Sequence, residues 1–220
     1  MGLARNIERR LERLVDGISA AVFRGRMHPV DLANRLVRQA DLLVVEGTAG
    51  PGIPNHFAVA VNDGDLDPSI SLPQLTAELD RTLYETAADR GWRIGGPIKV
   101  QIKPERSIGR GSIACTTSSE SGVLPAWIEL TEHRGDRTFL LGDNRNLIGR
   151  SDAAEVVLAE AEVSRNHGVV FREANRVWIT DLGSANGTFV NGHKVPTDPI
   201  EIGSGDMLSF GPATFAVRIF

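Results

Sequence analysis

At 220 residues the chain is long for one domain and short for three, so we expect two compact units. Hydrophobic residues make up 41% and charged residues 24%, which is ordinary globular usage and excludes a chain that is disordered overall. The formal net charge of -4 leaves no global field for recruiting nucleic acid or anionic lipid, so any anion site must be a local cluster.

The first predicted elements are two helices. Apolar residues recur every three or four positions from Leu3 to Ile18, which is typical of an amphipathic helix, and arginines occupy its other face. Such a charged face is either solvated or an interaction surface. A second helix is predicted to begin near His28, with Pro29 in its first turn, after the break FRGRM. The amino terminus is too charged for a signal peptide, and no apolar run approaches the ~20 residues of a membrane-spanning helix.

The next segment predicts a third helix and a small sheet. GTAGPGIPN indicates a loop, and the alternation in HFAVAVN then predicts a strand. Ser71 is suited to cap a helix that ends at Gly91. In PIKVQIKPE, apolar residues alternate with Lys, Gln and Lys, which predicts a strand with one face on a core and a basic face outward. Residues 1–120 are therefore expected to form an α+β domain with three helices on a small sheet.

The composition changes after this segment. SIGRGSIACTTSSESG is rich in small and hydroxyl residues, and it predicts a strand through Ile113 and Cys115 and then a short linker over residues 121–135. Cys115 is the only cysteine, which excludes an intramolecular disulfide framework and predicts a reducing, cytoplasmic location. Residues 136–220 hold short β-rich runs between Gly, Asn and Asp turns, which predicts an all-β sandwich of two antiparallel sheets.

The stretch EVSRNHG brings Ser164, Arg165 and His167 together and raises the question of catalysis. No glycine is followed by lysine, as a P-loop requires, HExxH is missing, and GxSxG does not surround Ser164. No pair of histidines has metal-ligand spacing on one element, so we expect no metal and no cofactor. A hydrolase using Ser164 and His167 would also need an orienting acid and an oxyanion hole, and the sequence favours this hypothesis least.

Three loops of the second unit supply groups that are suited to bind an anion. Arg150 follows the end of a predicted strand, and its planar guanidinium can hold two phosphate oxygens at once. Ser164 adds a hydroxyl donor and Arg165 a second cation in the next loop. In LGSANGTFVNG, Asn186 precedes a glycine suited to positive φ and can present its amide to a peptide backbone. The order IGR, SRNH and NGT is harder to obtain by chance than any one of these motifs.

Residues 136–220 resemble a forkhead-associated (FHA) domain, a phosphothreonine-peptide binder, through its motifs GR, SxxH and NG. The resemblance implies an eleven-stranded sandwich whose binding loops lie at one end. It implies contacts to the phosphate from Arg150 and Ser164, a flanking position for Arg165, and a contact to the peptide main chain from Asn186. Structural support of the site is implied for Gly149, His167 and Gly187. Ala185 stands where many members of the family have Thr or Ser, which removes a possible contact to the ligand.

The first unit resembles, more loosely, the FhaA-type amino-terminal domain (DUF3662-like) of actinobacterial proteins that act with membrane Ser/Thr kinases. The shared features are the GLxxxIERRLERLVDG helix, the HPVDLANRLVRQAD helix and the FAVAVN strand. Together the two resemblances imply a cytoplasmic signalling adaptor, not an enzyme, with links to cell-wall synthesis or cell division. Its expected partner is a phosphothreonine-containing kinase, pseudokinase or kinase substrate, which could recruit it to the inner membrane face. Neither a nucleic-acid partner nor direct membrane insertion is expected.

Another hypothesis stays open, in which the FHA unit serves self-assembly or autoinhibition through the protein's own phosphorylated linker. Thr116 and Thr117 are candidate kinase targets in the stretch Cys115 to Gly122, which is equally well a plain polar linker. Four acids near the expected pocket suggest a preference for basic residues around the phosphothreonine: Asp152, Glu155, Glu160 and Glu162.

Overall fold

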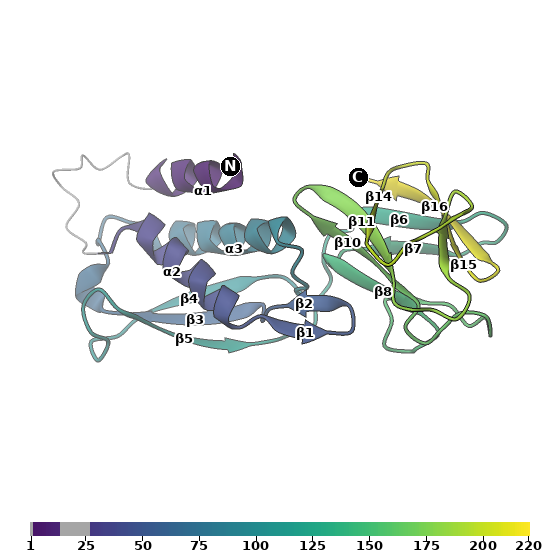
Figure 1. The fold of residues 1–220 in the computed structure, drawn as a ribbon. Helices are drawn as coiled ribbons and strands as arrows, with labels where there is room; N and C mark the ends of the chain where they lie inside the picture. The colour runs from purple at the N-terminus through teal and green to yellow at the C-terminus, as the bar shows by residue number, and fades with distance from the viewer. Residues whose placement is uncertain (1, 14–26) are drawn as a thin grey trace. The chain divides into compact units, whose positions relative to one another are not determined.

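The computed structural model describes residues 2–13 and 27–220, and the chain divides into two compact units (Figure 1). Unit 1 comprises Met1–Val45, Ile53–Ala87 and Ile94–Gly122. Unit 2 comprises Glu46–Gly52, Ala88–Arg93 and Val123–Phe220. Within the described ranges, no helix is both long enough and apolar enough to cross a membrane.

Unit 1 contains the helices that the sequence predicts. The elements are α1 (Gly2–Arg13), α2 (Pro29–Leu42), the short 3-10 helix η1 (Asp63–Asp65) and α3 (Leu72–Asp89). The expected continuation of α1 to Ile18 and most of the FRGRM break lie outside the described residues. Helix α2 begins where it was predicted, because the Val30 N–H donates to His28 Nδ1 (3.3 Å) and Pro29 occupies the first turn.

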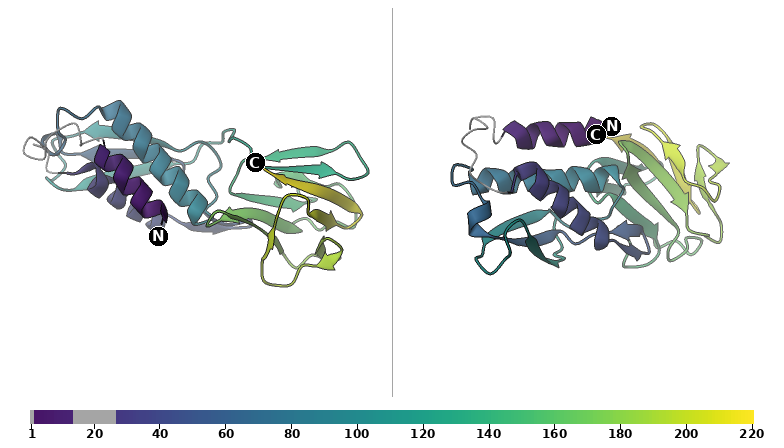
Figure 2. Two further views of the ribbon diagram at one scale, coloured as in Figure 1. Left: turned by 90° about the horizontal axis from the view of Figure 1, so that it is seen from above. Right: turned by 60° about the vertical axis from the view of Figure 1, so that its left-hand side comes forward.

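Three strands form the sheet of unit 1: β3 (His56–Val61), β4 (Lys99–Pro104) and β5 (Ile113–Ser118). Their order is β4-β3-β5, with β3 parallel to β4 and antiparallel to β5. A parallel pair needs a crossover connection, which α3 supplies. The helices lie on one face of this sheet (Figures 1 and 2), and Phe57, Val59 and Leu79 are almost fully buried in the core. The lysines of PIKVQIKPE are exposed, as predicted.

The segment GTAGPGIPN, expected to be a loop, contributes to a two-stranded hairpin of β1 (Val45–Gly47) and β2 (Gly50–Gly52). The loop prediction was wrong because glycine and proline, which usually interrupt strands, here serve the hairpin. Gly50 has a φ of 103°, which glycine adopts far more readily than other residues. Pro51 accepts a hydrogen bond at its carbonyl oxygen from the Arg93 N–H (2.9 Å), a contact that needs no donor from proline.

Unit 2 is a sandwich of two sheets whose described residues form eleven strands, in the orders β14-β11-β10-β8-β9 and β13-β12-β15-β16-β6-β7. The first sheet contains β8 (Arg145–Gly149), β9 (Val156–Val157), β10 (Gly168–Glu173), β11 (Arg176–Asp181) and β14 (Ile200–Ile202). The second contains β6 (Ile128–Glu132), β7 (Thr138–Leu141), β12 (Thr188–Val190), β13 (His193–Lys194), β15 (Met207–Phe210) and β16 (Ala213–Ile219). The pairs are antiparallel except for the short parallel pair β8–β9.

Strand β6 lies before residue 136, in the stretch that we expected to be a linker. It pairs with β16 from Glu132↔Phe215 to Ile128↔Ile219. Trp127, Ile128 and Leu130 are at most 6% exposed and belong to the apolar core of the sandwich. The compact unit therefore extends further toward the amino terminus than the expected domain.

Candidate functional site

The first loop of the candidate site follows strand β8. Arg150 has an exposed side chain whose Nε donates to the Val163 carbonyl oxygen (3.3 Å). Its main-chain N–H donates to the Ser164 carbonyl oxygen (2.9 Å), which joins the first loop to the second. A Cβ atom on Gly149 would collide with the main chain of Ser164 and Arg165. Glycine at 149 therefore permits the two loops to approach closely.

The second loop, between β9 and β10, carries Ser164 and Arg165. Ser164 Oγ accepts a hydrogen bond from the Ala185 N–H (3.0 Å), which leaves the hydroxyl proton free for a ligand. Arg165 is exposed, and its carbonyl oxygen accepts a hydrogen bond from the Ser151 N–H (3.1 Å). In residues 2–13 and 27–220, neither Arg150 nor Arg165 has a carboxylate partner. The two loops thus present two guanidinium groups and one hydroxyl donor, and neither guanidinium is paired with a carboxylate of the described residues.

His167 connects the second and third loops from a buried position. Its Nδ1 accepts a hydrogen bond from the Ser164 N–H (3.1 Å), and its Nε2 lies 3.2 Å from the Gly187 carbonyl oxygen. Because Nδ1 accepts, the ring is neutral and carries its proton on Nε2, which donates to Gly187. Burial lowers the pKa of His167, although the Gly187 carbonyl and the charge of Asp181 act in the opposite direction. The ring also packs edge-on against Phe210, with 5.6 Å between centroids.

These contacts do not assemble a nucleophile and its base. Both ring nitrogens of His167 are engaged by main-chain groups, and Ser164 Oγ is bonded to the Ala185 N–H instead of the imidazole. A serine activated for attack would need its hydroxyl directed at an accepting ring nitrogen. The three-residue spacing of Ser164 and His167 therefore allows the Ser164 main-chain N–H to donate to His167 Nδ1 within the loop.

The third loop, between β11 and β12, carries Asn186 and Gly187. Asn186 Nδ2 donates to the Glu162 carbonyl oxygen (2.8 Å) and so ties this loop to the second. The Asn186 amide oxygen remains available to accept a hydrogen bond from a bound peptide. Gly187 has a φ of 82°, as the NG pattern predicts. The four residues suggested to contact the ligand thus lie on three loops joined by direct hydrogen bonds.

Asp181, which the motifs did not single out, organises the third loop. Its carboxylate accepts hydrogen bonds from the N–H groups of Gly183 (3.0 Å) and Ser184 (2.9 Å). It also accepts from the hydroxyls of Ser184 (2.6 Å) and Thr188 (2.7 Å). Burial raises the pKa of Asp181, but the hydrogen bonds from Ser184 and Thr188 outweigh this effect and the pKa is lowered. The spacing DLGS, an Asx-turn pattern, was the available signal.

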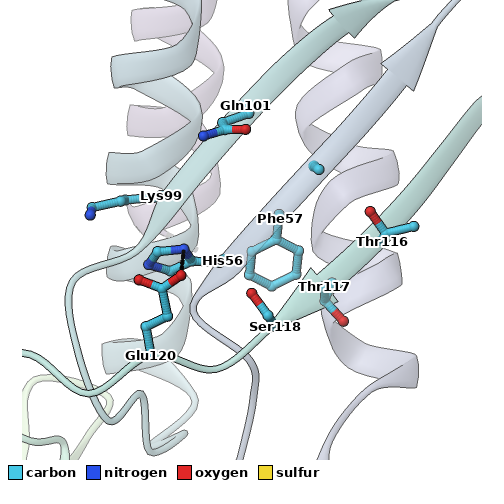
Figure 3. Close-up of a pocket in the computed structure, with 9 residues that line it drawn as sticks. His56, Phe57, Lys99, Gln101, Thr116, Thr117, Ser118 and Glu120 are labelled. Carbon is cyan, nitrogen blue, oxygen red and sulfur yellow. Dashed lines mark ion pairs between the residues drawn. The ribbon is translucent and has the colours of Figure 1, made fainter.

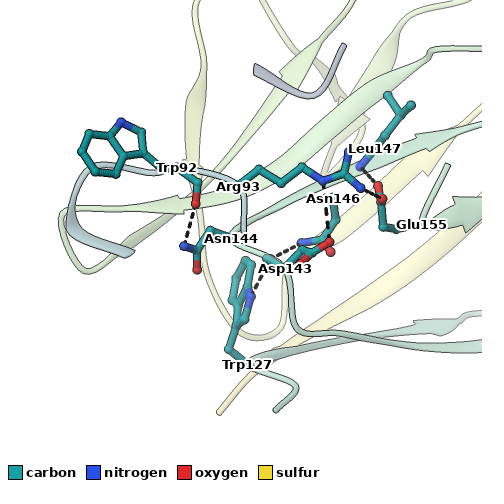
Figure 4. Close-up of polar contacts among 8 residues, drawn as sticks. All are labelled: Trp92, Arg93, Trp127, Asp143, Asn144, Asn146, Leu147 and Glu155. Atoms are coloured by element: carbon teal, nitrogen blue, oxygen red, sulfur yellow. Dashed lines mark hydrogen bonds and ion pairs between the residues drawn. The ribbon is translucent and has the colours of Figure 1, made fainter. Parts of the chain in front are cut away.

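The loop that follows Arg150 is held by Arg93, a residue of unit 2 from much earlier in the chain. The Arg93 guanidinium pairs with Glu155, and its Nε lies 3.6 Å from Asp143 Oδ2 (Figure 4). The other oxygen of Glu155 accepts a hydrogen bond from the Leu147 N–H (2.7 Å). Burial raises the pKa of Asp143, although the neighbouring Arg93 acts to lower it. Both carboxylate oxygens of Glu155 are therefore paired within the protein, and this residue is not available to attract basic residues of a ligand.

Glu160 is occupied as well. Its Oε1 lies 2.6 Å from Arg137 Nη2, and Arg137 also pairs with Glu132. Of the four acids suggested to attract a basic peptide, Asp152 and Glu162 remain exposed. Any such charge preference depends on these two residues.

The outer face of β8 and β10 in unit 2 is covered by residues 46–52 and 88–93. Asn144 Nδ2 donates to the Trp92 carbonyl oxygen (2.7 Å), as Figure 4 shows. The Arg145 guanidinium donates to the Gly91 carbonyl oxygen and lies over the Phe171 ring, 4.3 Å from its centroid. An apolar cluster fills the same face with Ala49, Leu147, Ala154, Val169 and Phe171. These two early segments are therefore part of the folded unit that presents the candidate site, and no local pattern in the sequence indicated this.

Thr116 and Thr117 lie on strand β5, not in a linker. They pair with Ala58 and Phe57 of β3. Thr116 is exposed and Thr117 is half-buried. In the described part of the chain, no group of three or more His, Cys, Asp or Glu side chains is arranged to hold a metal ion.

A β-sandwich with GR, SxxH and NG on three joined loops defines an FHA domain, and residues 146–211 match the FHA domain family model. Residues 4–116 match the model described as FhaA, N-terminal domain, and this match covers slightly more than half of the chain. The chain therefore belongs to the FhaA N-terminal domain family and carries an FHA domain after it.

Curated relatives match part of the chain. The FHA domain-containing protein FhaA of Mycobacterium tuberculosis is 32% identical over 83 residues, which is 38% of this chain and 15% of that protein. The glycogen accumulation regulator GarA of the same species is 32% identical over 97 residues, which is 43% of this chain and 59% of GarA. The chain thus spans less than two thirds of the length of each of these relatives.

Two solved structures show a similar degree of identity. One, from a structural and functional analysis of phosphothreonine-dependent FHA domain interactions, is 30% identical with a TM-score of 0.40, over 43% of this chain and 97% of the other. The second is the FhaA FHA domain complexed with the intracellular domain of Rv3910, 30% identical with a TM-score of 0.38, over 41% of this chain and 99% of the other.

Proposed function

We propose that the FHA domain of this chain binds a phosphothreonine-containing segment of a partner protein, and that the chain is a signalling adaptor and not an enzyme. The observation that carries the proposal is a pair of guanidinium groups, Arg150 and Arg165, that have no carboxylate partner among the described residues and lie on the same loops as the free hydroxyl proton of Ser164. A phosphate with nearly two negative charges and three acceptor oxygens is the complementary ligand.

The roles that we propose are those that the FHA resemblance implies. Arg150 and Ser164 hold the phosphate, Arg165 flanks it, and Asn186 accepts from the peptide main chain. Gly149, His167 and Gly187 keep the three loops together. Charge-assisted hydrogen bonds contribute about 1.5 to 3 kcal/mol each. Three such bonds would supply most of the about 8 kcal/mol that a micromolar complex requires, so the alanine at 185 does not prevent binding.

The partner we propose is a bacterial Ser/Thr kinase, a pseudokinase or a kinase substrate. The complex of the FhaA FHA domain with the intracellular domain of Rv3910 supports a protein ligand for this class of domain. A link to cell-wall synthesis or cell division, and recruitment to the inner membrane face by the partner, are further parts of the proposal. They derive from the FhaA resemblance.

The test is the affinity of the full chain for a degenerate phosphothreonine peptide library and its unphosphorylated counterpart, measured by fluorescence anisotropy. Arg150→Ala is expected to weaken phosphopeptide binding by about ten- to a hundredfold, the loss of one charge-assisted bond. Arg218→Ala, which removes an exposed arginine elsewhere in unit 2, is the matched control. Equal binding by wild type and Arg150→Ala would refute the proposal.

We also retain Thr116 and Thr117 as proposed phosphorylation sites. A kinase acceptor must be accessible, so exposed Thr116 is better placed than half-buried Thr117. Incubation of the full chain with a bacterial Ser/Thr kinase domain, followed by phosphosite mapping, would decide between modification of Thr116 and of neither residue.

A further inference from the structure

The sheet of unit 1 has a second face that the helices of this unit do not cover (Figures 1 and 2). Along β3, Phe57, Val59 and Val61 are buried toward the helices. The alternate residues His56, Ala58 and Ala60 are half-buried on the other face. Because alternate residues of a strand share one face, this second face is continuous across the sheet.

The strand registers build a groove on this face. Three rows cross the sheet in register: Lys99–His56–Ser118, Gln101–Ala58–Thr116 and Lys103–Ala60–Ala114. Two of the three central side chains are alanines, whereas the β4 side carries long polar side chains. Figure 3 shows Lys99 and Gln101 on one side of β3 and Thr116 and Ser118 on the other. The first two rows line a hollow of about 350 Å³.

The polar side chains of the groove walls have no hydrogen-bond partner within the part of the chain that the structure describes. The side chains of Lys99, Gln101, Thr116 and Ser118 make no hydrogen bond or ion pair with the described residues. Lys99 and Lys103 are two of the three lysines in the chain, and both lie on the same wall. Ammonium groups and hydroxyls donate hydrogen bonds, so the chemistry of the groove favours an acidic ligand.

Asn55 and Glu120 close one end of the groove through two hydrogen bonds. Buried Asn55 accepts from the Glu120 N–H (2.9 Å) and donates to the Glu120 carbonyl oxygen (2.9 Å). Glu120 Oε1 then lies 3.2 Å from His56 Nδ1, which occupies this carboxylate (Figure 3). Glu120 is the one acid among the residues that line the hollow, and it lies at this closed end, whereas Lys103 lies further along β4 in the opposite direction.

We propose that this groove binds an extended acidic segment of a partner protein. Lys99 and Lys103 are four residues apart on one strand, about 13 Å at 3.3 Å per residue. An extended ligand has the same repeat, so carboxylates at positions i and i+4 would face the two lysines. Gln101 and the hydroxyls of Thr116 and Ser118 would meet the polar residues between them. This surface lies in unit 1 and does not depend on phosphate recognition.

The experiment uses the full chain and two fluorescein-labelled peptides of the same length and composition, without phosphate. Both contain two glutamates among serines and glycines, either four residues apart or adjacent. Fluorescence anisotropy at low ionic strength should show tighter binding of the spaced peptide, because exposed charge pairs are screened by salt. The double variant Lys99→Glu with Lys103→Glu should bind it about tenfold more weakly, because both exposed charge pairs are replaced by like-charge repulsion.

Two controls separate the groove from other sites. Arg81→Glu makes the same type of charge change on helix α3, at a side chain that is 55% exposed, and should retain wild-type affinity for the spaced peptide. Arg150→Ala should also retain it, so failure of phosphopeptide recognition and failure of this proposal are distinguishable. A spaced peptide with lysines should bind the double variant better than wild type. Equal binding of the two acidic peptides, displacement by free citrate without any effect of spacing, or no effect of the double variant would overturn the proposal.

Discussion

Replacing Gly149 by alanine tests whether the close approach of the first two loops creates the phosphate site. The added Cβ would lie against the Arg165 carbonyl group, 2.8 Å from its carbon, and 3.0 Å from the Ser164 carbonyl oxygen. These neighbours are main-chain atoms, so relief requires the second loop to move, by an amount on the order of 1 Å to restore ordinary contact.

The magnitude follows from the bonds that such a shift would break. The Arg150 N–H to Ser164 bond (2.9 Å) and the Ser151 N–H to Arg165 bond (3.1 Å) join the two loops. At about 1 kcal/mol each, their loss predicts a decrease of about 2 kcal/mol in the free energy of unfolding. Moving Ser164 away from Arg150 should also remove at least one charge-assisted bond to phosphate, which corresponds to at least about tenfold weaker peptide binding.

Urea denaturation and phosphopeptide titration of the full chain measure the two effects. Gly203→Ala is the matched control, because a Cβ there meets no atom within 4 Å and the φ of Gly203 is ordinary. Gly203→Ala should therefore differ little from wild type in both assays. If Gly149→Ala kept wild-type stability and affinity, the steric explanation for the glycine would be refuted.

Two further predictions concern buried supports of the site. The pKa of His167 is lowered on folding, so the unfolded chain binds a proton at this residue more readily than the folded chain. The free energy of unfolding should therefore be highest above about pH 6.5 and should fall as the pH is lowered below that value, by at most about 1.4 kcal/mol per pH unit. Urea unfolding at several pH values should show a smaller fall for His167→Gln than for wild type, and parallel curves would contradict the assignment. Arg93→Ala should leave Glu155 and Asp143 without their cation, and a double-mutant cycle with Glu155→Gln should give a coupling of about 1 kcal/mol. Additive effects in that cycle would show that the pair does not stabilise the loop.

Local periodicity was sufficient to predict most regular elements. The helix start near His28, the cap at Ser71, the alternation in β3 and β4 and the glycine at the end of α3 all depend on neighbouring residues, so the sequence contains the signal. The hairpin β1–β2 was missed because its glycines and proline are also loop signals. Strand β6 was missed because its five residues gain their order from pairing with β16, which lies far along the chain.

The sequence did not indicate that residues 46–52 and 88–93 belong to unit 2, because their contacts are also distant along the chain. Ala49, Trp92 and Arg93 acquire their roles through Leu147, Asn144 and Glu155, and each of these contacts joins positions separated by more than fifty residues. A family boundary at residue 116 does not indicate such contacts, because it marks similarity in sequence and not burial. A fragment that begins at Val123 would expose Leu147, Val169 and Phe171, so binding studies on an isolated FHA fragment would examine a different surface from that of the full chain.

Within the candidate site, the residue types of SRNH do not indicate which side chains are already hydrogen-bonded within the protein, whereas the structure does. Ser164 and His167 are both polar and three residues apart. Both ring nitrogens of His167 are hydrogen-bonded to main-chain groups and are therefore not available to a ligand. Ser164 accepts one hydrogen bond and retains a proton, and Arg165 makes no ion pair at all in the described residues. An exposed donor without a partner in the described residues is hydrogen-bonded to water in the free protein, and a ligand can replace that water. A fully used polar group in the core is needed for folding alone, since leaving its partners unpaired would cost about 1 to 3 kcal/mol each.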